Sequence, residues 1–197
     1  MKNTFLIIGE GATEYYFLNS LKDDFRSLQN ISPKYPKHTS INQLESAIKE
    51  GINQGFTKVL CMIDMDNKKE GSEKAKYLSL KKKYHKKRFV IQKQGIDCFV
   101  RFFETERCTE LFFLFYFKFT TKLFESSDQV VYDLNKLSGY EKTKSFFQKH
   151  PLHPFFISKG GSLQRAINNS NKSLKESGLR GHTYSELGEL FAELGIE

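Results

Sequence analysis

The chain has 197 residues, of which 39% are hydrophobic and 27% charged, a balance typical of a globular domain with a buried core. Its most apolar late stretch, 111–119, is interrupted by Lys118 and is too short to span a bilayer, so we expect no membrane segment. With 31 Lys and Arg against 23 Asp and Glu, the net charge is +8, which is compatible with a polyanionic partner but does not identify one.

The cysteines and the N-terminus indicate the compartment. Cys61, Cys98 and Cys108 lie in or beside apolar segments and lack the spacing of metal ligands. Free thiols in a reducing environment are the simplest interpretation, which places the protein in the cytoplasm. The N-terminus leads directly into a predicted strand, so we expect no secretory signal.

The first half of the chain alternates predicted strands and helices. A strand over 4–9 is followed by a helix over 13–28, which carries an apolar stripe at helical spacing. Residues 31–38 contain two prolines and are interpreted as a loop. A helix over 41–55 begins after Ser40, and a second strand covers 58–63. Strands joined through helices predict right-handed crossovers and a mostly parallel sheet.

The second half becomes progressively helical. A helix over 73–87 precedes two strand candidates at 88–92 and 99–104, and 108–119 has leucines and phenylalanines at helical spacing. Further helical patterns occur at 130–137, 140–150, 162–174 and 184–194. His150 and His153 flank Pro151 in a predicted loop.

The predicted fold class is therefore α/β, a short parallel sheet flanked by helices. Residues 1–119 form this core, and residues 120–197 form a helical C-terminal extension packed on it, as one compact domain.

Two acidic motifs each follow a predicted buried strand. Glu10 stands between Gly9 and Gly11, and Asp64 and Asp66 are two residues apart, so both project to the same face of an extended chain. Parallel strands end at the edge where α/β folds place their sites. If the two strands are neighbours, Glu10 completes a cluster of three acids. Such a cluster would be neutralised by Mg²⁺ or Mn²⁺, which prefer oxygen ligands.

Each acid also has a plain structural interpretation. Aspartate is common at strand ends because loops begin there. Glu14 lies one helical turn beyond Glu10, where it either extends the acidic cluster or is an acid favoured by the helix dipole. Glu110 stands in an aromatic segment, where it is either paired or metal-bound in the site, or faces solvent at a helix start.

The basic residues are concentrated in one run, which consists of Lys81, Lys82, Lys83, Lys86, Lys87 and Arg88. Both a solvated helix face and a surface that binds the phosphate backbone fit this run. Lys142 and Lys159 are candidates for a cation that stabilises a phosphate, although each also fits an ordinary surface lysine.

With both acidic motifs placed, the chain resembles the RloB-like family, a branch of the Toprim superfamily. Residues 8–17 (IGEGATEYYF) look like the family's E-G-x-T-E-x-x-Y/F segment, and 63–66 (IDMD) look like its D-x-D strand end. Residues 103–117 resemble its aromatic block P-C-F-E-L-W-F-L-L-H-F, in which Cys108 and Glu110 match. The ordered set of three motifs extends the resemblance over nearly the whole chain.

The chain departs from this pattern at four positions, namely Arg107 for Pro, Thr109 for Phe, Phe112 for Trp and Tyr116 for His. If the family's histidine does chemistry, this chain lacks it. We interpret Tyr116 as a packing position with a polar tip.

The resemblance implies a Toprim-like core in which Glu10, Asp64 and Asp66 hold Mg²⁺ or Mn²⁺ for phosphodiester hydrolysis on DNA or RNA. Glu14 is a further candidate metal ligand, and Glu110 a further candidate catalytic residue. The family also implies anti-phage defence by abortive infection, with an ATPase partner. The alternative is a non-catalytic module of a defence complex that binds nucleic acid or senses phage. The sequence does not decide whether the chain forms homo-oligomers.

Overall fold

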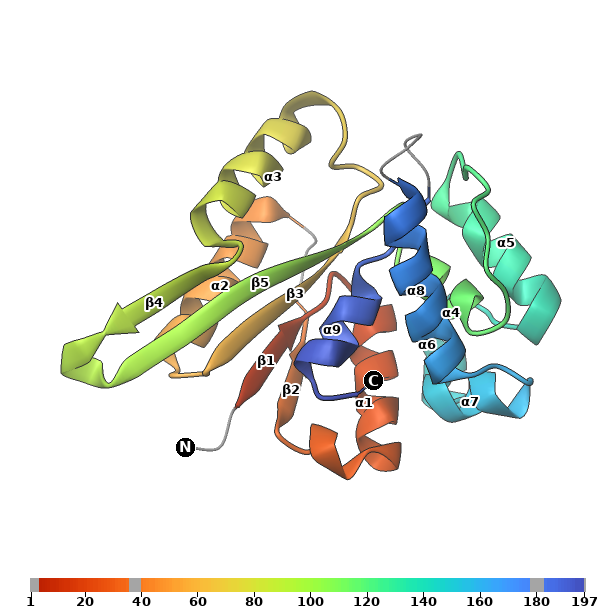
Figure 1. Cartoon of the computed structure of the whole chain (residues 1–197), viewed down its shortest axis with the longest axis horizontal. Helices are drawn as coiled ribbons and strands as arrows, with labels where there is room; N and C mark the ends of the chain where they lie inside the picture. The colour runs from red at the N-terminus through yellow and green to blue at the C-terminus, as the bar shows by residue number, and fades with distance from the viewer. Residues whose placement is uncertain (1–3, 36–39, 178–182, 197) are drawn as a thin grey trace.

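The computed structural model describes residues 4–35, 40–177 and 183–196 (Figure 1). Within them a five-stranded sheet has the order β2-β1-β3-β5-β4. The strands are β1 (Phe5–Ile8), β2 (Ile31–Lys34), β3 (Lys58–Asp64), β4 (Lys87–Ile91) and β5 (Ile96–Thr105). All neighbouring strands are parallel except β4, which runs antiparallel to β5. The predicted α/β class with a mostly parallel sheet is confirmed.

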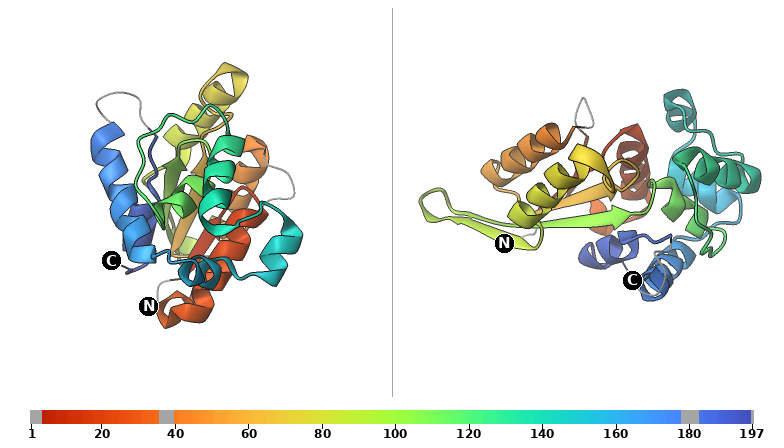
Figure 2. Two further views of the ribbon diagram at one scale, coloured as in Figure 1. Left: turned by 90° about the vertical axis from the view of Figure 1, so that its right-hand side faces the viewer. Right: turned by 90° about the horizontal axis from the view of Figure 1, so that it is seen from above.

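Helices cover both faces of this sheet and one of its ends. One face carries α2 (Ile41–Asn53) and α3 (Gly71–Tyr84), and the other carries α1 (Ala12–Asp24) and α9 (Leu187–Glu193) (Figure 1). The other helices gather beyond the carboxyl ends of β3 and β5 (Figure 2). They are α4 (Glu110–Phe115), α5 (Ser127–Ser138), α6 (Lys144–Lys149), α7 (Leu152–Ser158) and α8 (Leu163–Ser177). Two 3-10 turns are η1 (Arg26–Leu28) and η2 (Gln92–Gln94).

Alternate side chains of the central strands enter two separate cores, as the pleat of a strand requires. On β1, Ile7 packs toward α1, whereas Leu6 and Ile8 pack toward α2. The core on the α1 side continues through the aromatic residues of α4 into α7 and α8. One apolar core therefore joins the sheet to the C-terminal helices, and it fixes the loops that surround the carboxyl edge.

The prediction of a loop over 31–38 is wrong for its first part, because Ile31–Lys34 forms β2 beside β1. Ile31 is buried, and the main-chain nitrogen of Gly9 donates to the carbonyl of Lys34 at 2.9 Å. This register turns the nitrogen of Pro33 toward the open edge of the sheet. Proline is tolerated there because an edge strand needs no donor on its outer side.

The C-terminal helices differ in extent from the prediction. His153 lies inside α7, not in a loop, because Pro151 sits at the start of that helix, where proline costs no hydrogen bond. Its ring Nδ1 lies 3.0 Å from the hydroxyl of the buried Tyr116, which is a packing residue with a polar tip, as predicted. The helices predicted over 108–119 and 140–150 are shorter in the structure than predicted, and they correspond to α4 and α6.

All three cysteines are buried and free, so the free-thiol prediction is confirmed. Burial raises the pKa of each thiol, which makes the thiolate scarce at neutral pH. No helix within the described residues has the length and hydropathy needed to cross a bilayer.

Candidate functional site

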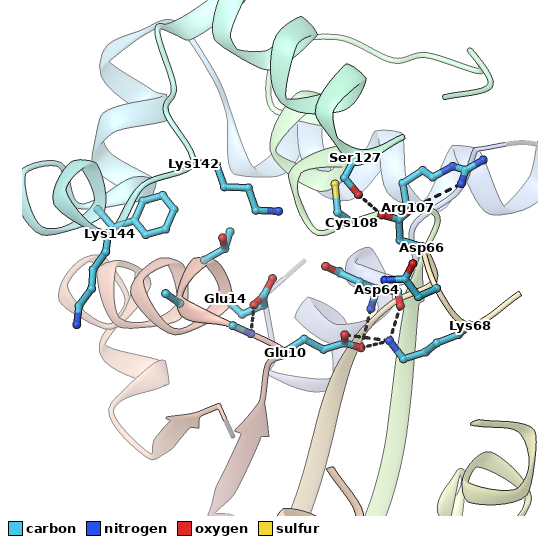
Figure 3. Close-up of a pocket in the computed structure, with 15 residues that line it drawn as sticks. Glu10, Glu14, Asp64, Asp66, Lys68, Arg107, Cys108, Ser127, Lys142 and Lys144 are labelled. Carbon is cyan, nitrogen blue, oxygen red and sulfur yellow. Dashed lines mark hydrogen bonds and ion pairs between the residues drawn. The ribbon is translucent and has the colours of Figure 1, made fainter. Parts of the chain in front are cut away.

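The two acidic motifs meet at the carboxyl edge of the sheet. β1 and β3 are parallel neighbours with Ile8 opposite Cys61, so the prediction that these strands are adjacent is confirmed. Glu10, two residues after β1, therefore reaches the end of β3. Its Oε1 accepts a hydrogen bond from the main-chain nitrogen of Asp64 at 3.1 Å (Figure 3).

A cavity of about 420 Å³ lies at this edge, and we call it the edge cavity. Acids enter it from the β1–α1 turn, the first turn of α1 and the end of β3, and cations enter it from three loops and the start of α6. These charged residues are Glu10, Glu14, Asp64, Asp66, Lys68, Arg107, Lys142 and Lys144. The edge cavity thus combines the two kinds of charge that a metal ion and a phosphate would require.

Glu14 is held in the edge cavity by the turn between β1 and α1. Its Oε2 accepts a hydrogen bond from the main-chain nitrogen of Gly11 at 2.8 Å, and the residue is only 3% exposed. Gly9 provides the space, because a Cβ atom at that position would lie 2.3 Å from the Cβ of Glu14. Glu14 is therefore both an acid of the first turn of α1 and a buried member of the acidic cluster.

Asp64 lies at the centre of the cluster. Its Oδ1 accepts a hydrogen bond from the Thr109 hydroxyl at 3.1 Å. Burial, followed by the charges of Glu14 and Glu10, raises the pKa of Asp64 well above its usual range. Burial also raises the pKa of Glu14, and it raises the pKa of Glu10 despite the opposing charge of Lys68. Ionising all three together is costly unless a cation lies among them.

Asp66 occupies the rim of the edge cavity. Its Oδ2 accepts a hydrogen bond from the hydroxyl of Ser127, the first residue of α5, at 2.6 Å. Its Oδ1 lies 3.4 Å from the guanidinium of Arg107. Arg107 has a φ of 64°, in the left-handed region that side chains with a Cβ rarely adopt. The turn after β5 is therefore strained where it directs this cation toward the site.

Glu110 lies behind the edge cavity and is not one of its lining residues. It is fully buried, so the interpretation as a solvent-facing helix-start acid is wrong. Its Oε1 accepts hydrogen bonds from the hydroxyls of Thr13 at 3.3 Å and Tyr140 at 3.0 Å. Its Oε2 accepts one from Lys142 Nζ at 3.0 Å. These contacts offset the cost of burying the carboxylate.

Lys142 projects from the segment between α5 and α6 into the edge cavity (Figure 3). Burial alone would lower the pKa of Lys142, but the charge and hydrogen bond of Glu110, together with the charges of Cys108 and Asp64, outweigh burial and raise it. Lys142 is therefore a cation held in place opposite the acids. Its side chain is 43% exposed, so Lys142 is a surface lysine that is also paired with a buried acid.

Sequence reasoning missed three cations that line the edge cavity, namely Lys68, Arg107 and Lys144. Lys68 Nζ lies 2.6 Å and 2.9 Å from the two carboxylate oxygens of Glu10. Nothing in the local sequence separates it from Lys69, which pairs with Glu106 instead. For Arg107, the replacement of the family's proline by arginine was a feature of the sequence that could have identified it as a site residue.

None of the residues of the basic run of 81–88 lines the edge cavity. Three of its residues form ion pairs, Lys81 with Glu104, Lys83 with Glu45, and Arg88 with Asp97. Lys87 pairs with Val100, whereas Asp64 pairs with Thr105 on the same strand. Five residues of strand separate the two levels, roughly 16 Å at a rise of about 3.3 Å per residue. Lys159 ends α7 beside the ring of Phe155 and does not line the edge cavity either.

The acidic cluster fits a hard divalent cation in its donor chemistry. Its ligands are carboxylates, and their pKa values are raised first by burial and then by the neighbouring acids, a cost of ionisation that a cation would relieve. Across the residues that the structure describes, no three Asp, Glu, His or Cys side chains are arranged to hold a metal together. Mg²⁺ is usually bound by one or two carboxylates, with waters and substrate phosphates completing the shell. Asp64 and Glu14 would supply two such carboxylates, whereas both oxygens of Glu10 already contact Lys68.

The fold and the edge cavity define an α/β protein with a buried acidic site at the carboxyl edge of a mostly parallel sheet. A family model for RloB-like proteins matches residues 5–194, and the chain belongs to this family. Membership supports a role associated with restriction and defence in general terms. Comparison with curated proteins and with solved structures finds no significant match.

Proposed function

We propose that the chain is a metal-dependent, nuclease-like hydrolase that acts on phosphodiesters of DNA or RNA through a Toprim-like acidic site. The observation that supports this most is the cluster of Glu10, Glu14 and Asp64, whose pKa values are all raised, in the same cavity as the cation Lys142. Perturbed pKa values of this kind concentrate at functional sites. From family membership we further propose action in anti-phage defence with an ATPase partner.

Asp64 and Glu14 would hold Mg²⁺ or Mn²⁺, which supplies charge stabilisation and an activated water when bound. Glu10 would accept the proton of the attacking water, since its raised pKa suits a general base. Lys142 would stabilise the charge that develops on the phosphate oxygens, because its ammonium group faces the acids and stays protonated at neutral pH.

Arg107 and Lys144 would hold the nucleic-acid backbone on either side of the reacting phosphate. They lie on opposite sides of the edge cavity (Figure 3). Contacts of this kind position a nucleic acid without reading its sequence. The proposal therefore includes no sequence preference.

The competing proposal is a binding module that recognises nucleic acid without cleaving it. It is favoured by the pairing of Glu10 with Lys68 and by the lack, among the described residues, of three groups arranged to hold a metal. In that case the acidic cluster would be structural, and a partner would supply catalysis.

Asp64→Asn separates the two proposals, with Asp97→Asn as the matched control in the exposed β4–β5 hairpin. For a nuclease, Asp64→Asn should lower metal-dependent cleavage more than about 100-fold, since even residues that only support a metal ligand contribute 10- to 100-fold. Thermal stability and nucleic-acid affinity should be retained, and Asp97→Asn should cleave like the parent.

The substrates are single- and double-stranded DNA and RNA, each with Mg²⁺ and with Mn²⁺. If the parent and Asp64→Asn protect cells from phage equally well, and neither cleaves any substrate, the nuclease proposal is overturned and the binding module stands.

A further inference from the structure

Lys68 carries a buried ammonium group at the centre of the site. The residue is 8% exposed and lies in the loop between β3 and α3. Its Nζ donates to Glu10 Oε1 at 2.6 Å, to Glu10 Oε2 at 2.9 Å and to the carbonyl oxygen of Asp64 at 2.7 Å. Lysine is almost never buried unless it is paired, and here all three contacts are oxygens.

These three oxygens form a cage for one cation. Two come from the carboxylate after β1 and one from the main chain at the end of β3, so both strand ends contribute. The main-chain nitrogen of Asp64 also donates to Glu10 Oε1, at 3.1 Å. The carboxylate of Glu10 therefore accepts three hydrogen bonds, and its charge is already matched by an ammonium ion.

We infer that Lys68 is the resident cation of the site and takes the place that a metal ion bound by Glu10 would occupy. The protein then binds one divalent ion per chain, through Asp64 and Glu14, and Glu10 is not a metal ligand. This inference rests on the proposed metal-dependent function and specifies how the same site is built.

The arrangement gives Lys68 a positioning role that it exerts through Glu10. The ammonium group fixes the orientation of the Glu10 carboxylate and opposes the effect of burial on its pKa. In a site that would otherwise hold several ionised acids, a tethered cation lowers the number of metal ions needed for neutrality. Its neighbour Lys69 pairs with Glu106 through a side chain that is 42% exposed, and therefore serves as the matched control.

The test is to count bound Mn²⁺ ions by electron paramagnetic resonance, in the parent and in Glu10→Gln, Asp64→Asn, Lys68→Met and Lys69→Met. We expect one ion per chain in the parent, in Glu10→Gln and in Lys69→Met, and none in Asp64→Asn. Lys68→Met should bind a second ion, and the double variant Lys68→Met/Glu10→Gln should return to one.

Two ions in the parent, one of them lost in Glu10→Gln, would overturn this inference and leave the proposed function intact. An unchanged count in Lys68→Met would also overturn it. No binding in the parent at millimolar Mn²⁺ would overturn the proposed metal dependence, and this inference with it. If Lys68→Met does not fold, the comparison of the parent with Glu10→Gln still decides the question.

Discussion

Lys142 and Glu110 form an ion pair across the back wall of the edge cavity, and the two residues have different exposures. The carboxylate of Glu110 is fully buried and also held by Thr13 and Tyr140, whereas the side chain of Lys142 is 43% exposed. The rigid member of the pair is therefore the acid, and the lysine is the member that can reach a substrate. Glu110 is in this view a positioning residue.

Removing the Lys142 charge should slow cleavage without unfolding the protein. We expect Lys142→Met to lower the single-turnover rate by about 100-fold, the cost typical of losing one group that stabilises transition-state charge. Its thermal stability should fall below that of the parent, because Glu110 is left buried without its cation, so both rates are measured at a temperature at which the variant is folded. The exposed Lys149→Met serves as control, and a parent-like rate in Lys142→Met would refute this role.

Glu110→Gln supplies a readout that a purely structural role would not change. Glutamine retains an acceptor for Tyr140 but removes the charge that raises the pKa of Lys142. With burial then dominant, the pKa of Lys142 falls, so the decline of the rate at high pH should begin at a lower pH than in the parent. A pH–rate profile measures this shift.

At the scale of secondary structure, the sequence was most informative where the signal is local. The buried strands β1 and β3 are short apolar runs, and the acids after them follow from where such strands end. β2 was missed because its sequence contains Pro33, which only an edge position accommodates. The position of Pro151 at the start of α7 likewise depends on the helices against which α7 packs.

The same difference between local sequence signals and features set by packing explains which residues of the site could be predicted. Glu10 and Asp64 were predictable because strand pairing places them together. Lys68 and Arg107 were not, since loop conformations direct their side chains, including a left-handed backbone at Arg107. The basic run at 81–88 was conspicuous in the sequence, yet Lys81 and Arg88 are paired within the fold. Local charge density therefore did not identify the cations of the edge cavity.

The junction of α3 with β5 makes the fold sensitive to acid. His85 caps the carboxyl end of α3, and its Nδ1 accepts a hydrogen bond from the main-chain nitrogen of Phe102 at 3.0 Å. Burial, and then the charges of Lys81 and Lys86, lower the pKa of His85 to about 4. Below the unfolded value of about 6.5, the unfolded chain binds more protons than the folded one. The contribution of neutral His85 to the free energy of unfolding is therefore fully present above about pH 6.5, and it is lost as the pH falls toward about 4.

We expect His85→Asn to remove that acid sensitivity. The contribution is about 1 kcal/mol, a figure reduced because His85 is partly exposed and screened by solvent. Urea unfolding at about pH 7 and about pH 4.5 measures it. The loss in free energy of unfolding between the two pH values should be smaller in His85→Asn than in the parent. Equal losses would show that His85 does not link stability to pH.

At the scale of the whole molecule, the carboxyl end of β3, which borders the edge cavity, and the tip of the β4–β5 hairpin lie at opposite ends of the sheet (Figure 1). Lys82, Lys86 and Lys87 lie near the start of β4, and all three are exposed. The rise along β5 between Lys87 and the level of Asp64, roughly 16 Å, corresponds to about five base pairs at 3.4 Å each. A nucleic acid bound at the edge cavity could therefore extend to these lysines along its backbone.

Replacing Lys82, Lys86 and Lys87 together by Gln tests this reach. If each contacts a phosphate, the slope of log affinity against log salt should decrease by about 2.7 for duplex DNA, or by about 2 for a single strand. Mn²⁺ binding should not change, because none of these three lysines lines the edge cavity. The control replaces Lys136, Lys172 and Lys175, which are on α5 and α8. An equal decrease in the control would mean that only net charge matters. An unchanged slope in the first variant would restrict nucleic-acid contacts to the edge cavity, where Arg107, Lys142 and Lys144 would carry them.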